Sequence, residues 1–111
     1  MKRILIIGGG AAGIAAALTA KHHAPEAEVL LLERLDRVGK KILATGNGRC
    51  NLTNKNALNH DYYNKEFASV ALNKFNVGKT LEFFNSLGLY TVTDTEGKVY
   101  PMSNTAASVV D

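Results

Sequence analysis

The sequence predicts an α/β fold: a βαβ unit with an incomplete parallel sheet, followed by helices and a small β-hairpin. Three observations support this prediction. Short apolar runs at 3–7 and 28–33 have the length and the flanking residues of buried strands. An alanine-rich segment with helical spacing lies between them. A glycine-rich turn joins the first run to that segment, as expected where a strand leads directly into a helix.

The residues of the βαβ unit set its expected boundaries. The first strand is Arg3–Ile7. The helix runs from Gly13 to about His23 and ends before Pro25, because the residue preceding a proline is pushed out of the α region. The second strand, Glu28–Glu33, is a continuous apolar run, which is typical of a parallel strand covered on both faces.

The remainder of the chain is predicted from spacing, turns and caps. Residues 34–60 lack periodicity and form a long loop, which in a compact domain is usually functional or disordered. Two helices follow, the second capped by Asn76 and ended at Gly88. Residues 89–93 and 98–100 form a hairpin, and Ser103 caps a last helix that starts at Asn104. The aromatic residues expected in the core are Phe67, Phe75, Phe83 and Phe84.

Length and composition are those of an ordinary globular domain. The 111 residues are 46% hydrophobic and 21% charged, and the net charge of +3 is spread along the chain, so a nucleic-acid partner has weak support. The single cysteine, Cys50, excludes an intrachain disulfide and favours a reducing compartment. The basic start of the chain imitates a signal peptide, but three glycines interrupt its apolar run. We expect a cytoplasmic protein without a membrane segment.

The chain is expected to be the N-terminal part of a longer protein. Only two strands of the parallel sheet are visible in the sequence, and the last predicted helix has no stop signal. A complete small domain is the alternative, because small domains do fold with few strands.

The chemistry of the chain is indicated first by its glycine motif. The segment 8–13, G-G-G-A-A-G, matches the pattern G-x-G-x-x-G, follows a strand and opens a helix. Gly8 permits the tight turn, Gly10 lets the backbone approach a pyrophosphate, and Gly13 lets the helix pack close to the strand. The pyrophosphate would lie at the helix N-terminus, where free N–H groups and the helix dipole favour negative charge.

Glu33 completes this Rossmann-like dinucleotide site. It ends the second strand, twenty residues after Gly13, where an acidic residue accepts hydrogen bonds from the adenosine ribose. A carboxylate there argues against NADP, because it would repel a 2′-phosphate. It does not separate NAD from FAD, since both carry the same ribose. The alternative is a plain turn followed by a solvated strand end.

The segment 39–54, G-K-K-I-L-A-T-G-N-G-R-C-N-L-T-N, resembles a bacterial family of NAD(P)/FAD-dependent oxidoreductases called BaiN-like or aminoacetone-oxidase-like. The family has a G-(R/K)-K-hydrophobic segment that runs into G-x-G-R-C-N-(L/I)-T-N. The segment 96–103, E-G-K-V-Y-P-M-S, is similar to a second family pattern, although Lys98 and Tyr100 stand where arginine and phenylalanine are common. The resemblance extends over essentially the whole chain.

This resemblance implies an FAD domain of the two-dinucleotide-binding type, with the rest of that domain and an inserted second domain beyond residue 111. It also implies that FAD is bound non-covalently, with residues 39–41 near the ribose and pyrophosphate and residues 46–51 near the isoalloxazine. The candidate cofactor-binding residues are Gly8, Gly10, Ala11, Ala12, Gly13, Glu33, Arg34, Gly39, Lys40, Lys41, Gly46, Asn47, Gly48, Arg49, Cys50 and Asn51.

Several of these residues have simpler interpretations. Arg49 either polarises the flavin or pairs with a carboxylate that fixes its loop. Lys40 and Lys41 are either cofactor contacts or a solvated basic pair. Cys50 is more simply a small buried residue than a redox thiol, because it has no C-x-x-C partner. His22 and His23 have no second cluster with which to form a metal site.

We expect a flavin-dependent oxidoreductase that moves a hydride between a nicotinamide, the flavin and a small organic substrate. The substrate would carry an activated C=C bond, and NAD(P)H would be the reductant. One alternative is an NAD-binding module without catalysis, and another is a flavin enzyme that reduces uridine in ribosomal RNA. No catalytic residue is identifiable from the sequence.

Overall fold

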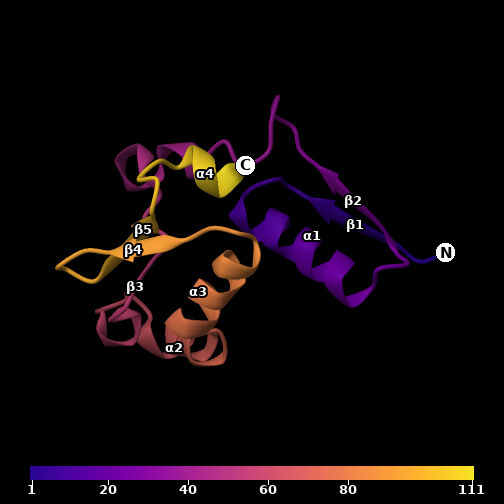
Figure 1. Cartoon of the computed structure of the whole chain (residues 1–111). Coiled ribbons are helices and arrows are strands. Elements are labelled where there is room, and N and C mark those ends of the chain that lie inside the picture. The colour runs from indigo at the N-terminus through magenta and orange to yellow at the C-terminus, as the bar shows by residue number, and fades with distance from the viewer.

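The α/β fold is confirmed. The computed structural model describes residues 1–111 and places two groups of elements beside each other (Figure 1). The first is the βαβ unit of β1 (Arg3–Ile7), α1 (Ala11–His23) and β2 (Glu28–Leu32). The strands β1 and β2 pair in parallel from Arg3 opposite Glu28 to Ile7 opposite Leu32.

The two predicted boundaries at the carboxyl ends of the strands are shifted. The helix α1 begins at Ala11, two residues before the expected start, because Gly10 is extended at a φ of −81° and a ψ of −174° and is itself the N-cap. The strand β2 ends at Leu32 rather than Glu33. The side chain of Glu33 instead turns back to accept a hydrogen bond from the N–H of Gly9. Both shifted boundaries therefore lie at the glycine turn: α1 starts directly after Gly10, and the residue that follows β2 bonds Gly9.

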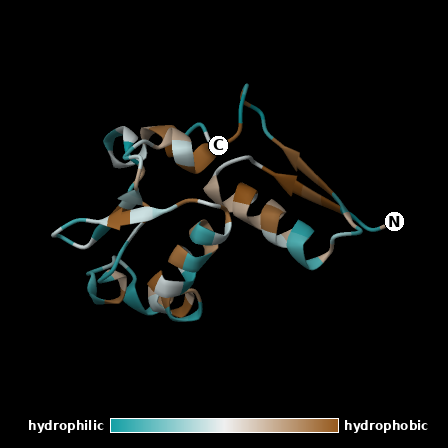
Figure 2. Ribbon diagram, viewed as in Figure 1, coloured by the Kyte–Doolittle hydropathy of each residue, from teal (hydrophilic) through white to brown (hydrophobic).

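One face of the two-stranded sheet is covered and the other is open. Ile4 and Ile6 alternate with Leu5 and Ile7 along β1, and the former pair lies on the side of α1. Leu5 is 56% exposed and Ile7 is 75% exposed. Figure 2 shows the apolar colour along both strands, and the open face carries the exposed side chains of Leu5, Ile7, Leu30 and Leu32.

The second group is built on a three-stranded antiparallel sheet in the order β3-β5-β4. Its strands are β3 (Thr53–Asn54), β4 (Thr91–Thr93) and β5 (Lys98–Pro101). The predicted hairpin is confirmed as β4 and β5, whereas β3 lies inside the segment expected to be a loop. Val99 in the central strand is fully buried, and Ala106 is 1% exposed, so the core of this group lies along β5 and the segment that follows it.

Helices flank this small sheet. The long loop predicted for 34–60 contains the 3-10 segments η1 (Ile42–Gly48) and η2 (Ala57–Asn59), so that prediction was wrong in part. The helices α2 (Lys65–Lys74) and α3 (Val77–Ser86) follow. The predicted cap of α3 is confirmed, because the side chain of Asn76 accepts the N–H of Lys79 at 2.9 Å. Gly88 follows the helix in the left-handed region, as expected.

The predictions for the last helix and for the phenylalanine core were wrong. The helix α4 is Ala107–Val110, because Asn104 adopts a left-handed φ of 60° that a helix cannot continue. The hydroxyl of Ser103 bonds the hydroxyl of Ser108 instead of capping. Phe67 is 79% exposed and Phe75 is 52% exposed, whereas Phe83 and Phe84 are half-buried and pack edge to face.

None of these helices combines the length and the apolar character that crossing a bilayer requires.

The cap of α3 gives a test of the fold. Replacing Asn76 with alanine removes the acceptor for the N–H of Lys79 and should lower the free energy of unfolding by about 1 kcal/mol. Urea unfolding followed by circular dichroism measures the change. Asn76→Asp is the matched control, because it keeps the oxygen acceptor and should retain the stability. Equal stabilities of Asn76→Ala and Asn76→Asp would contradict the assigned cap.

Candidate functional site

The glycine turn between β1 and α1 has the geometry that the sequence predicted. Gly8 has a φ of 99°, which favours glycine, and its N–H donates to the carbonyl of Leu32 at 2.7 Å. A Cβ added at Gly13 would overlap the carbonyl oxygen of Gly8, so any larger residue would push the helix away from the strand. A Cβ added at Gly10 would meet no atom within 4 Å. The turn is therefore tightly packed at Gly13 and open at Gly10.

The open side of the turn is the N-terminus of α1. Ala11 and Ala12 are exposed, and no side chain caps this end. The first hydrogen bond of the helix runs from the N–H of Ile14 to the carbonyl of Gly10. The N–H groups of the residues before Ile14 therefore have no acceptor within the helix. Free N–H groups and the positive end of a thirteen-residue helix thus lie beside the open space at Gly10, an arrangement that suits a phosphate.

Glu33 is fixed against this turn by two backbone hydrogen bonds. Its Oε2 accepts the N–H of Gly9 at 2.7 Å, and its Oε1 accepts the N–H of Leu35 at 2.9 Å. The N–H groups of Leu35 and Gly9, in that order of importance, lower the pKa of the Glu33 carboxyl below its ordinary value. A carboxylate has about four acceptor sites. Glu33 therefore stays ionised and keeps acceptor capacity for the hydroxyls of a ribose.

The segment after β2 returns to the same turn. Gly39 is buried, and its N–H donates to the carbonyl of Gly9 at 2.7 Å. Lys40 is exposed and forms an ion pair with Asp36 at 3.0 Å, a partner that the sequence analysis did not predict. Lys41 is exposed and forms none of the ion pairs of the chain. Arg34 is also exposed, and its charge helps to lower the pKa of Glu33.

A second cluster of predicted residues forms a tight turn at the end of η1. Gly46, Asn47, Gly48 and Cys50 all have positive φ values, between 55° and 82°. The N–H of Cys50 bonds the carbonyl of Thr45 at 3.0 Å and closes the turn. Cys50 is 6% exposed, which confirms that it is a small buried residue. Asn51, the last residue of the cluster, is exposed.

Within residues 1–111, Arg49 is held by an amide and an aromatic ring rather than by a carboxylate. Its Nε donates to the side-chain oxygen of Asn104 at 2.7 Å. Its guanidinium carbon lies 3.9 Å from the centre of the Tyr100 ring, which is cation–π geometry. The side chain is otherwise exposed and makes no further hydrogen bond within the chain.

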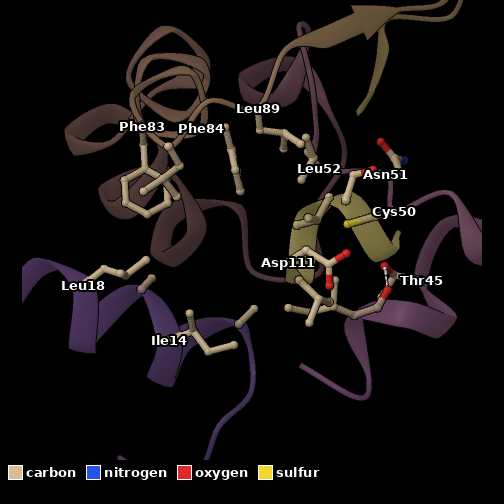
Figure 3. A pocket seen from close by; sticks show the side chains of 17 residues that line it. Ile14, Leu18, Thr45, Cys50, Asn51, Leu52, Phe83, Phe84, Leu89 and Asp111 are labelled. Atoms are coloured by element: carbon tan, nitrogen blue, oxygen red, sulfur yellow. Dashed lines mark hydrogen bonds between the residues drawn. The ribbon is translucent and has the colours of Figure 1, made fainter. Parts of the chain in front are cut away.

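An apolar cavity of about 510 Å³ lies between the start of α1 and the second cluster (Figure 3). Ala11, Ile14 and Leu18 line it from α1, while Cys50 and Asn51 line it from the other side. Its volume is within the range of small-molecule sites. Phe83 and Phe84 of α3 also line the cavity, so residues of the helix start, of α3 and of the segment next to Arg49 border one space.

Sequence reasoning missed three residues that shape the site. Gly9 is buried and supplies the N–H that fixes Glu33, and its place in a run of three glycines was the available signal. A Cβ at Gly9 would lie 2.7 Å from Val38 Cγ1, so the middle position also requires glycine. Tyr100 and Asn104 contact Arg49 from more than fifty residues away, and no local pattern predicts such a contact.

Comparisons with known proteins agree with this geometry. The family model "HI0933-like protein Rossmann domain" matches residues 2–111. The chain is 53% identical over its whole length to the 3-dehydro-bile acid delta(4,6)-reductase of Clostridium scindens. It is 32% identical over 96% of its length to the ribosomal RNA dihydrouridine synthase of Escherichia coli. The chain spans about a quarter of the length of each relative, 27% and 26% respectively.

The lowered pKa of Glu33 predicts an acid-dependent loss of stability. The ionised carboxylate stabilises the fold at pH values above its ordinary pKa of 4.5, and this contribution disappears as the pH falls through the lower pKa of the folded state. Glu33→Gln should therefore be less stable than the natural chain at pH 7, and the difference should shrink toward pH 3. Urea unfolding at both pH values measures it.

Glu82→Gln is the control, because Glu82 is exposed on α3 and forms none of the ion pairs of the chain. A stability difference for Glu33→Gln that is the same at both pH values would contradict the assigned role of the carboxylate.

Proposed function

The chain belongs to the HI0933-like Rossmann-domain family, and we propose that it is part of an FAD-dependent oxidoreductase. Family membership confirms the resemblance drawn from residues 39–54. The observation on which the proposal rests is the glycine turn, where the open side of Gly10, the start of α1 and the ionised Glu33 lie together. This combination suits the pyrophosphate and ribose of a dinucleotide.

The residues present fit FAD in two separate places. Gly8, Gly10 and the first turn of α1 would hold the pyrophosphate, and Glu33 would accept hydrogen bonds from the ribose hydroxyls. The turn at 46–51 offers small residues and the Arg49 guanidinium to the other end of the cofactor. Bound flavin would supply hydride transfer, a reaction whose organic chemistry belongs to the cofactor.

The proposed substrate carries a C=C bond conjugated to a carbonyl, with NAD(P)H as the source of the hydride. The relative at 53% identity is named a reductase of 3-dehydro-bile acids, which supports this class. The relative at 32% identity is named for making dihydrouridine in ribosomal RNA, and this supports a uracil ring as the second candidate. Both names describe the reduction of a ring C=C bond, so the two candidates share one chemistry.

The same proposal treats the chain as the N-terminal part of an FAD domain. The relatives are roughly four times as long, and the apolar face formed by Leu5, Ile7 and their neighbours on β2 is open to solvent. Parallel sheets are normally covered on both faces. We assign that cover to further parts of the same polypeptide, together with an inserted second domain. The single buried cysteine supports a cytoplasmic, reducing location.

Gly10→Val in the full-length protein tests the cofactor site. The valine side chain should fill the open space meant for the pyrophosphate, so flavin content should fall from about one FAD per chain toward none. Absorbance of the purified protein at the flavin band, about 450 nm, measures it. The melting temperature of the apoprotein should change little, because a Cβ at Gly10 meets no protein atom within 4 Å.

Two control variants separate ligand effects from folding effects. Ala16→Val adds the same side chain on an exposed part of α1 and should keep its flavin. Gly13→Ala should destabilise the fold itself, because the new Cβ would overlap the carbonyl oxygen of Gly8. Full flavin content in Gly10→Val would refute the assignment of the turn.

The substrate class is tested by flavin reoxidation. The full-length protein, reduced with NADH or NADPH without oxygen, should be reoxidised by a steroid whose C=C bond is conjugated to its 3-oxo group, with loss of the enone absorbance. The control is the saturated 3-oxo steroid, which offers no C=C bond. Reoxidation by neither steroid, combined with a gain of two mass units in ribosomal RNA, would favour the second candidate.

A further inference from the structure

The turn at 46–50 is held in a conformation that local sequence alone does not favour. Four of its residues are in the left-handed region, and two of them, Asn47 and Cys50, are not glycine. A left-handed residue other than glycine costs about 1 kcal/mol or more, and such residues persist where the surrounding structure forces them. The contacts that hold this turn therefore also determine where the side chain of Arg49 lies.

Those contacts come from the end of β5 and the segment that joins it to α4. The N–H of Ala106 donates to the carbonyl of Gly48 at 2.8 Å. Asn104 accepts the hydrogen bond from Arg49 Nε, and the Tyr100 ring lies under the same guanidinium. We refer to residues 100–106 as the brace. Tyr100 and Ala106 are buried, so the brace is itself anchored in the core of the small sheet.

The brace fixes the direction of the Arg49 side chain. The Tyr100 ring holds the guanidinium from one side, with the guanidinium carbon 3.9 Å from the ring centre, and the bond to Asn104 occupies Nε. The edge formed by the two Nη groups makes no hydrogen bond within the chain. A guanidinium is permanently charged and can donate two parallel hydrogen bonds from that edge. The Nη edge of Arg49 is thus available to donate hydrogen bonds to a planar, electron-rich group.

We propose that Tyr100 and Asn104 are positioning residues that aim the Nη edge of Arg49 at the pyrimidine part of the flavin. This inference rests on the proposed function and adds a role for two residues outside the cofactor-binding turn. Reduction by a hydride adds two electrons and leaves negative charge on the N1–C2 edge of the flavin. A fixed guanidinium there stabilises the reduced form without any reorganisation, and so raises the reduction potential.

The test uses the full-length protein with Asn104→Gly and Tyr100→Leu. Glycine tolerates the φ of 60° at position 104, so this variant removes the amide without straining the backbone. Both variants should still bind FAD but shift the ratio of oxidised to reduced flavin about tenfold toward oxidised, which is about 30 mV for a two-electron couple. Tyr100→Phe keeps the aromatic face and should retain the natural potential.

A second readout needs no flavin. In the full-length apoprotein, hydrogen exchange of the backbone amides in residues 46–51 should be several-fold faster in Asn104→Gly and Tyr100→Leu than in the natural protein or in Tyr100→Phe. Exchange in α1 is the internal control and should be unchanged. Equal exchange in all variants would show that the brace does not order the turn, and would overturn the inference.

The outcomes distinguish this inference from the proposed function. An unchanged potential in Asn104→Gly, alongside a lowered potential in Arg49→Gln, would show that Arg49 acts without the brace. An unchanged potential in all three variants, with FAD fully bound, would show that Arg49 does not face the flavin, while the FAD assignment would stand. Absence of FAD from the natural full-length protein would instead refute the proposed function, and the inference with it.

Discussion

The close packing of Gly13 against the carbonyl of Gly8 determines how the site is built. Because no side chain fits at Gly13, the first turn of α1 rests directly on the end of β1. The helix then starts at Ala11, and its N-cap, Gly10, borders open space rather than a neighbouring side chain. The same turn leaves the N–H of Gly9 free to bind Glu33, so one backbone constraint creates both the open helix start and the anchored carboxylate.

A second constraint links the C-terminal segment with the loop that follows β2. Gly39, which bonds the carbonyl of Gly9, is packed so closely against Val110 that an added Cβ would lie 2.9 Å from it. Ala106, shortly before Val110, bonds the carbonyl of Gly48. The segment that ends in α4 therefore contacts the loop after β2 at two points. Through these contacts the segment that follows the small antiparallel sheet touches both candidate clusters, although it belongs to neither.

Features with a local cause were predictable from the sequence, and features with a distant cause were not. Asn76 caps α3 through the amide three residues later, and Gly88 ends it, so both could be predicted from neighbouring residues. The strand β3 exists only because Val99 lies opposite Thr53. Phe67 was wrongly placed in the core, because helical spacing shows which residues share a face but not whether anything covers that face.

The two candidate clusters differ in what holds them, and this difference has a functional consequence. The glycine turn, Glu33 and Gly39 are linked by hydrogen bonds among residues 8–39, so that cluster is largely self-contained. The turn containing Arg49 depends on the brace, which belongs to another part of the fold. Under the proposed function, affinity for the dinucleotide and the electrostatic environment of its reactive end would thus be set by separate contacts. Substitutions in the brace would then change the second property and leave the first intact, because no hydrogen bond of the first cluster involves the brace.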